Sequence, residues 1–224
     1  MNAILIALLC GVLTGLSFPR PGLCLLAWFS LAPLFFLWRQ DGNWKRAGLI
    51  GLAAGLGYHG TVLNWVYSLC RFAGLSAFIA VLAWGSLALF LALSWGAVGV
   101  LGRRFAGRNP WAWAVLWTAV TVVAERWTPR LCVDLLGYTQ WRHTALLQIS
   151  ALAGPHFLGF LVVAFNAVIE RAWGESAGDK PQPATAINLA LALALAAGSW
   201  GYGVYELARR TQAGAAGTQY PIGR

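Results

Sequence analysis

The stretch AGLSAFIAVLAWGSLALFLALSWGAVGVL, residues 73–101, decides the fold of this chain, because none of its side chains is charged. An α-helix rises 1.5 Å per residue, so about 20 apolar residues cross the roughly 30 Å hydrocarbon core of a bilayer. This stretch is longer than that, and a helix of such length crosses with a strong tilt. It therefore predicts a transmembrane helix.

Six other apolar stretches flank this one, and short polar loops separate them. They are residues 4–18, 23–38, 47–70, 111–124, 145–169 and 184–207. A membrane β-barrel would instead show roughly 10-residue segments of alternating polarity, which the sequence does not contain. Residues 126–144 mix polar and apolar side chains, as in a segment on the outer membrane surface that is part loop and part interfacial helix. We therefore predict an all-α fold, a polytopic membrane bundle of about seven transmembrane segments.

The composition excludes several other classes of protein. Charged residues form 10% of the chain and hydrophobic residues 59%, whereas a soluble domain carries about 25% charged residues. The net charge is +9, but the basic residues are spread over short loops, so we expect no nucleic-acid partner. The four cysteines form no C-x-x-C pair and no cluster with histidine, so we expect no metal site and no cofactor.

The basic loop residues predict an orientation, because Lys and Arg favour the cytoplasmic side of short loops. Before residue 110, the loops 39–46 and 103–108 hold three basic residues each, against Arg20 and Arg71 on the opposite side. Met1 is therefore expected in the cytoplasm, and seven crossings put Arg224 outside. The first apolar stretch has no basic residue before it and no A-x-A site, so we expect a retained helix and not a cleaved signal peptide.

Three polar residues in or beside the apolar stretches allow both a structural and a functional interpretation. Asn64 in hydrocarbon needs a partner, usually on a neighbouring helix. His59 lies near mid-span, where an ionisable side chain suggests function, but a neutral histidine bonded to a backbone carbonyl is as plausible as a proton carrier or metal ligand. Glu125, at a helix end, is either a structural partner of Arg126 or part of a binding site.

Five short motifs occur in order along the chain, and together they carry a resemblance. They are Ser17-Phe18-Pro19, Ala32-Pro33-Leu34, Asn64-Trp65-Val66-Tyr67, Ala124-Glu125-Arg126-Trp127 and Leu136-Gly137-Tyr138-Thr139-Gln140. In this order and at this spacing they resemble the N-terminal membrane domain of bacterial apolipoprotein N-acyltransferase. The resemblance covers residues 5–207.

The resemblance implies an eight-span protein of the bacterial inner membrane whose seventh helix leads into a periplasmic nitrilase-like domain. Such an enzyme moves an acyl chain from a phospholipid to the N-terminal cysteine of a diacylated lipoprotein. A nucleophilic Cys forms a thioester, a Glu acts as general base and a Lys stabilises the oxyanion. Phospholipid and diacylated lipoprotein are therefore the expected partners.

No catalytic residue of that family maps onto this chain. Lys45 and Lys180 both fall in loops predicted to be cytoplasmic, and a lysine there cannot stabilise an oxyanion across the membrane from Cys70 or Cys132. We expect residues 1–210 to form the transmembrane bundle and residues 211–224 a polar tail where the nitrilase domain would begin. The chain alone is expected to be inactive and to need a separate nitrilase-like subunit.

The membrane motifs supply the candidate site. By resemblance, five side chains line or brace the lateral opening through which phospholipid and lipoprotein enter: Trp65, Tyr67, Glu125, Tyr138 and Gln140. Two other readings stay open, namely a non-catalytic relic or lipid-binding membrane protein and a small-solute transporter. Transporters show paired intramembrane charges, and the apolar stretches hold no acidic residue at mid-span.

Overall fold

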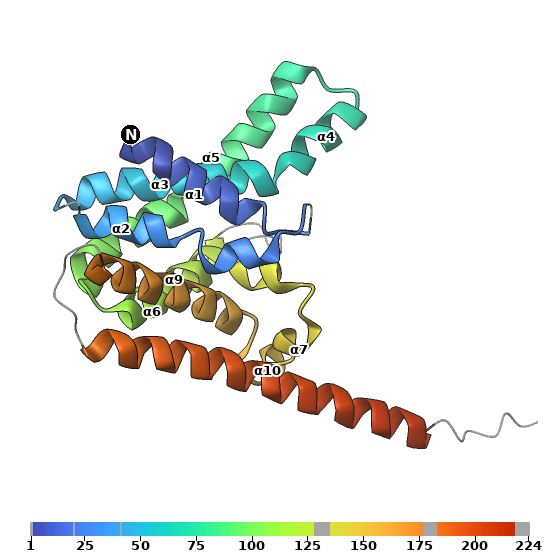
Figure 1. Cartoon of the computed structure of the whole chain (residues 1–224). Helices are drawn as coiled ribbons and strands as arrows, with labels where there is room; N and C mark the ends of the chain where they lie inside the picture. Colours follow the sequence, from blue (N-terminus) through green and yellow to red (C-terminus); the bar gives the residue numbers. More distant parts are fainter. Residues whose placement is uncertain (1, 20, 41, 128–134, 177–182, 218–224) are drawn as a thin grey trace, which may run out of the picture.

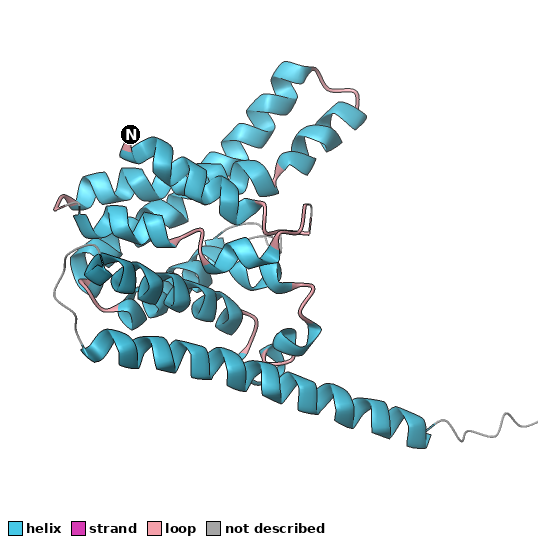
Figure 2. Cartoon of the chain, viewed as in Figure 1, coloured by secondary structure: helices cyan, strands magenta, loops and turns pink. Residues whose placement is uncertain are grey.

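The structure is a computed structural model that describes residues 2–19, 21–40, 42–127, 135–176 and 183–217. Every regular element in these ranges is helical, and no strand occurs among them (Figure 2). The predicted all-α fold is confirmed. Three helical stretches, 77–106, 156–175 and 183–212, are long and apolar enough to cross a membrane, and shorter apolar helices accompany them.

The helices pack in two groups (Figure 1). In the first, α3 (Trp44–Val62) lies between α1 (Ala3–Gly15) and α5 (Ala77–Leu101). In the second, α9 (His156–Ser176) contacts α2 (Ala32–Gln40), α6 (Pro110–Trp127) and α10 (Pro183–Gly217). Aromatic side chains join the groups in one buried cluster, in which Trp95 of α5 contacts Trp117 of α6 with ring centroids 4.8 Å apart.

The outward faces of the longest helices are apolar. On α5, the side chains of Phe78, Leu82, Leu89 and Leu93 are all exposed. A helix that is apolar on every side is typical of a protein core or a membrane span. These faces are exposed in the isolated chain, so they fit hydrocarbon and the chain is a membrane protein.

The predicted stretch 23–38 is interrupted. It consists of the 3-10 helix η1 (Cys24–Trp28) and α2, with Phe29–Leu31 between them. Pro33 explains the interruption, because its ring would clash with the carbonyl of Phe29 in a continuous helix. Asn166 of α9 pairs two backbone groups there: its Oδ1 accepts from Leu31 N at 2.9 Å and its Nδ2 donates to Ala27 O at 2.8 Å.

The predicted stretch 47–70 divides into α3 and α4 (Asn64–Phe72) at Leu63. Trp84 of α5 donates its Nε1–H to Gly60 O at 3.1 Å, the carbonyl that Asn64 N would use in a continuous helix. Asn64 itself is exposed at the start of α4. We had expected it to lie between two helices, and it does not. With the first half of α5, α4 forms a hairpin that projects from the bundle (Figure 1).

The predicted stretch 145–169 is also broken. Two single-turn helices, α7 (Thr144–Leu147) and α8 (Ser150–Ala153), precede Gly154, whose φ of 80° is accessible mainly to glycine, and Pro155. The described half of the surface segment forms the 3-10 helix η3 (Leu136–Gln140), which packs on α9 and η1. Helix α10 runs on to Gly217 and extends past the bundle (Figure 1).

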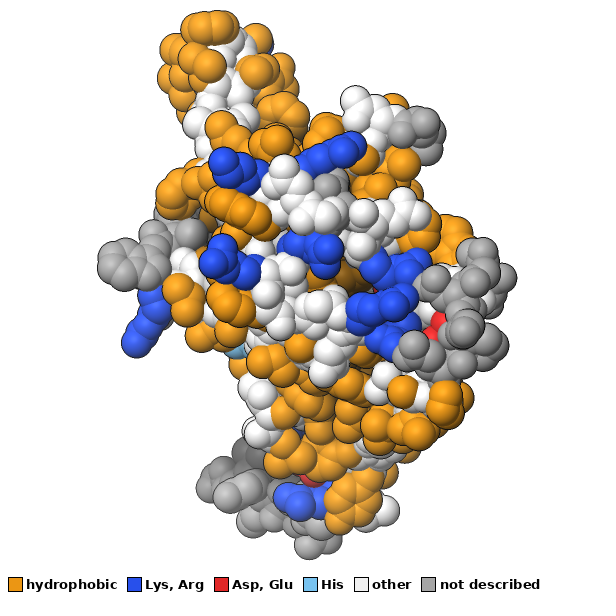
Figure 3. Space-filling view, turned by 90° about the vertical axis from the view of Figure 1, so that its left-hand side faces the viewer, with side chains coloured by type: hydrophobic (Ala, Val, Ile, Leu, Met, Phe, Trp, Pro, Cys, Tyr) orange, Lys and Arg blue, Asp and Glu red, His pale blue; other side chains and the backbone are white. Residues whose placement is uncertain are grey.

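Basic side chains gather at one end of the bundle, which we call the basic end. It carries the C-terminus of α2, the π-helical turn η2 (Gly102–Ala106) and the N-termini of α3, α6 and α10. Its described basic residues are Arg39, Lys45, Arg46, Arg103, Arg104, Arg108 and Arg171. Figure 3 looks onto this end and shows the Lys and Arg side chains surrounded by apolar ones.

Candidate functional site

A lateral groove lies between the second half of α5 and α6, with a volume of about 900 Å³. Its walls are almost entirely apolar, with Leu91, Leu93 and Ala97 from α5 facing Leu116, Ala119 and Val120 from α6. Ser94 and Thr121 also line it, and their hydroxyls donate to carbonyls of their own helices. The groove therefore offers a site for a hydrocarbon chain.

The floor of the lateral groove is aromatic and buried, and its rim is open. Trp95 and Trp117 are buried beneath it, with ring centroids 4.8 Å apart at an interplanar angle of 71°. Along the rim, Phe90, Phe105 and Val123 are exposed. An occupant could thus enter sideways from the hydrocarbon of the membrane.

One end of the lateral groove is polar. Glu125, in the last turn of α6, lines the groove, and its Oε2 lies 3.3 Å from Nε2 of His156 at the start of α9. Both side chains are partly exposed, at 35% and 24%. The structure therefore pairs Glu125 with His156 and not with its neighbour Arg126. The carboxylate can accept hydrogen bonds from a polar headgroup, and the imidazole can donate or accept them.

Two of the predicted site residues lie on the projecting hairpin. Trp65 and Tyr67 are 42% and 37% exposed on α4. Between them, Val66 packs with Leu63, Ala88 and Leu91 in a small cluster that fixes α4 on α5. The two aromatic rings are thus presented by a fixed helix.

The other two predicted residues lie on η3 and differ from each other. Tyr138 is exposed, whereas Gln140 is fully buried. Gln140 Oε1 accepts from Trp28 Nε1 at 3.0 Å, and its Nε2 donates to Cys24 O at 3.1 Å. His143 Nδ1 lies 3.1 Å from the same Oε1. Gln140 therefore fastens η1 to η3, and within this structure it braces the site without lining it.

His59 is buried at the inner side of the lateral groove. Its Nδ1 lies 2.9 Å from Gly55 O, one turn earlier in α3, and its ring contacts Tyr58 edge-on. This is the geometry of a histidine bonded to a backbone carbonyl, one of the two alternatives that the sequence left open. No group of three metal-ligating side chains occurs in the described residues.

Comparison with known proteins gives the family. Residues 10–168, more than half of the chain, match the model of the apolipoprotein N-acyltransferase N-terminal domain. The chain belongs to this family. The match extends from α1 to α9 and includes the lateral groove, the hairpin and η3.

Three relatives named apolipoprotein N-acyltransferase illustrate the similarity. The protein of Geobacter metallireducens is 33% identical over 190 residues, which are 80% of this chain and 35% of the relative. That of Nostoc sp. is 28% identical over 66% of this chain and 32% of the relative. That of Photobacterium profundum is 37% identical over 49% of this chain and 21% of the relative. The chain thus spans about a third of the length of the first two relatives.

The sequence motifs predicted the family but not the lateral groove. His156 gave no signal, because it lies far from Glu125 in the sequence and follows Pro155 at a helix start. The groove itself depends on the spacing of α5 and α6, which no local pattern encodes. Cys132 and Lys180, which we compared above with the catalytic Cys and Lys of the family, lie outside the described residues.

Proposed function

We propose that this chain is the membrane module of an apolipoprotein N-acyltransferase-like enzyme of lipoprotein maturation. In this role it holds a phospholipid and a diacylated lipoprotein while a nitrilase-like module transfers the acyl chain. The lateral groove is the observation that carries the proposal. It is apolar, opens sideways and ends in the polar pair Glu125 and His156.

The groove suits one acyl chain better than a polar solute. Its volume of about 900 Å³ falls at the upper end of the usual range of small-molecule pockets, about 300–1,000 Å³. Along α6, the lining from Ala112 to Val123 extends about 16 Å at 1.5 Å per residue. An acyl chain laid along it would bring its ester and headgroup to Glu125.

The exposed aromatic residues fit a role at the membrane surface. Trp and Tyr collect at the headgroup level because one part of the ring is apolar and another polar. Trp65 and Tyr67 on the hairpin and Tyr138 on η3 have this exposure. In our proposal they line the lateral opening, while Gln140 holds η3 in place behind it.

The charge distribution supports an orientation in the bacterial inner membrane. The basic end carries seven described Lys and Arg residues at helix ends and in the short segments between them, so we place it in the cytoplasm with the N-terminus. The end with Glu125 and the C-terminal part of α10 then face the periplasm. There the lipoprotein and a nitrilase-like module would meet the groove.

Catalysis in this proposal belongs to the nitrilase-like module, whether it is a separate subunit or a part of the same polypeptide. Its Cys, Glu and Lys would form and resolve the thioester, as the resemblance implies. This chain would contribute binding and orientation, which alone lower a barrier by holding the reacting groups together.

Reconstitution tests the proposed function. The full chain is placed in phospholipid vesicles with a diacylated lipoprotein and a purified nitrilase-like domain, and the lipoprotein mass is measured. We expect an added acyl chain when both proteins are present and none with either alone. If the nitrilase-like domain acylates the lipoprotein equally well without this chain, the proposed role is wrong.

A further inference from the structure

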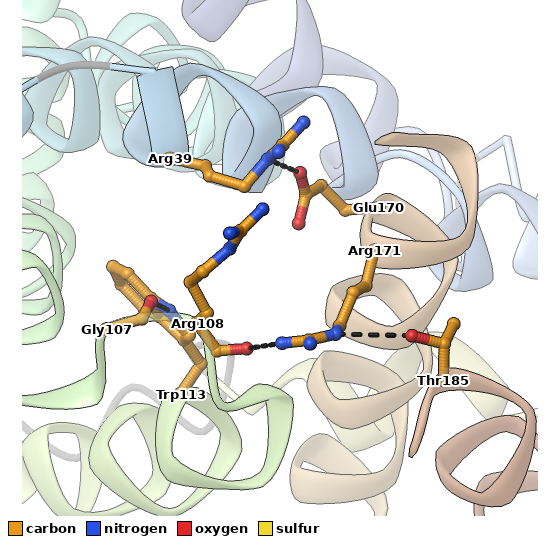
Figure 4. A network of polar contacts seen from close by, with 7 residues as sticks. All are labelled: Arg39, Gly107, Arg108, Trp113, Glu170, Arg171 and Thr185. Carbon is orange, nitrogen blue, oxygen red and sulfur yellow. Dashed lines mark hydrogen bonds and ion pairs between the residues drawn. The ribbon is translucent and has the colours of Figure 1, made fainter. Parts of the chain in front are cut away.

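A second cavity lies at the basic end, at the opposite end of α6 from Glu125. We call it the basic pocket, and its volume is about 250 Å³. Phe35 and Trp113 form its apolar side, and Arg39, Arg108 and Arg171 reach it from three different segments (Figure 4). Glu125 and Pro110 lie at opposite ends of α6, about 22 Å apart at 1.5 Å per residue, so the basic pocket is separate from the polar end of the groove.

Hydrogen bonds within the protein fix two of the arginines. Arg39 Nε donates to Oε1 of the buried Glu170 at 2.6 Å. Arg171 donates through Nε to Thr185 Oγ1 at 3.3 Å and through an Nη to the carbonyl of Arg108. These contacts tie the ends of α2, α9 and α10 together and hold the guanidinium groups at the cavity wall.

The third arginine points into the space between the other two. In Figure 4 the side chain of Arg108 rises from the loop before α6 toward Arg39 and Glu170. Its backbone position is set on one side by Gly107, whose carbonyl accepts from Trp113 Nε1 at 3.1 Å. On the other side its own carbonyl accepts from Arg171. A short, well-anchored loop thus presents the Arg108 guanidinium to the cavity.

The charge of the lining favours an anion. Among the described residues of the lining, three guanidinium groups face two carboxylates, Glu170 and Glu175, and the surrounding basic end adds Arg103 and Arg104. The planar fork of Arg matches the oxygens of a phosphate group, and Arg is favoured wherever phosphate is recognised at close range. Basic pockets between membrane helices on the cytoplasmic side are a known setting for lipid headgroups.

We propose that the basic pocket binds the phosphate group of an anionic phospholipid headgroup. The phosphate lies between Arg39 and Arg108, the first acyl carbons lie against Phe35 and Trp113, and Glu170 keeps Arg39 in place. This lipid belongs to the leaflet at the basic end and is distinct from the acyl donor in the lateral groove. Its binding locks the ends of α2, α6 and α9 together.

Thermal unfolding of the full chain in neutral maltoside detergent tests this site. Phosphatidylglycerol, phosphatidylcholine and inorganic phosphate are added in separate arms. The key variant is Arg108→Gln, and Arg104→Gln is its matched control, because Arg104 is exposed at the same end and does not line the pocket. We expect phosphatidylglycerol to raise the Tm of the natural chain and of Arg104→Gln by about 5 °C. Arg108→Gln should lose more than half of this shift.

Each arm has a defined meaning. A shift with inorganic phosphate that Arg108→Gln removes supports the phosphate site with soluble phosphate as its ligand. Three results would overturn the proposal. They are equal shifts in Arg104→Gln and Arg108→Gln, a shift with phosphatidylcholine equal to that with phosphatidylglycerol, or no shift with either phosphatidylglycerol or inorganic phosphate. If Arg108→Gln does not fold, Arg108→Lys replaces it: Lys keeps the charge but loses the fork, so the shift should fall to an intermediate value.

Discussion

Nε2 of His156 lies 3.3 Å from Oε2 of Glu125, and this contact joins the start of α9 to the end of α6. It is the polar end of a groove whose walls are otherwise almost wholly apolar. The contrast resembles that within a phospholipid, which has a long apolar part and a polar head. The pair therefore defines which end of the groove a headgroup would occupy.

Replacement of Glu125 separates binding from stability. Glu125→Gln removes the charge but keeps the side-chain length, and a partly exposed contact between a carboxylate and a histidine contributes about 0–1 kcal/mol, so the free energy of unfolding should change little. Binding of a phospholipid headgroup should weaken about threefold, because a charge-assisted hydrogen bond is lost. Retention of radiolabelled phosphatidylethanolamine measures this. Glu206→Gln, which changes a carboxylate on α10 paired with Arg210, should leave retention unchanged.

Asn166 should be essential for stability. Asn166→Leu leaves Ala27 O and Leu31 N without their side-chain partner in a buried break of the chain. Each buried unpaired group costs about 1–3 kcal/mol, so for the two groups we expect a loss of about 2–6 kcal/mol in the free energy of unfolding. Asn188→Leu is the control, because it removes a single bond from Trp111 Nε1 at a half-buried site and should cost about 1 kcal/mol. Equal losses in denaturant titrations would contradict this assignment.

Two glycine substitutions should have opposite effects on stability, because Gly11 lies where α1 packs closely on α3 and Gly85 has open space beside it. A Cβ at Gly11 would lie 1.8 Å from Ala54 O, so Gly11→Ala must push the helices apart and cost about 1–3 kcal/mol. A Cβ at Gly85 on α5 meets no atom within 4 Å, so Gly85→Ala should stabilise the helix by up to about 1 kcal/mol. Thermal unfolding of both variants checks the prediction, and a stable Gly11→Ala would exclude the tight contact.

The hairpin offers a neighbouring pair of residues with different roles. Trp65 is exposed, so Trp65→Ala should change the free energy of unfolding by less than about 0.5 kcal/mol. Val66 is buried against α5, so Val66→Ala should cost about 1–2 kcal/mol. In lipid-retention measurements the order should reverse, with Trp65→Ala the weaker binder. A Trp65→Ala chain that unfolds more easily than Val66→Ala would show that Trp65 supports the fold.

The sequence predicts the fold wherever the cause is local. Uncharged residues from 73 to 101 give α5. Asn109 caps the start of α6 locally, since its Oδ1 accepts from Trp111 N at 3.0 Å. The interruption of the stretch 23–38 also has a local cause in Pro33. We did not predict this interruption, because the stretch 23–38 stays apolar on both sides of the break.

Features made by contact between distant segments could not be read in advance. The division at Leu63 depends on Trp84 of another helix, and the pairing of Glu125 depends on His156. Gln140 was expected to line or brace the lateral opening, and its contacts with Trp28 and Cys24, far away along the chain, could not be predicted from the motif. The motifs therefore predicted candidate residues, and the contacts of each side chain are known only from the structure.

Photo-crosslinking tests most directly whether the lateral groove holds a lipid chain. The full chain is placed in vesicles that contain phosphatidylethanolamine with a diazirine in its acyl chain. Labelled peptides should come from α5 and α6 along the lateral groove. Ala119→Trp, which fills the groove, should lower this labelling at least about fivefold, whereas Ala194→Trp on the exposed face of α10 should not change it. Equal labelling of both variants, or labelling spread evenly over all exposed helices, would contradict the claim that the groove holds a lipid chain.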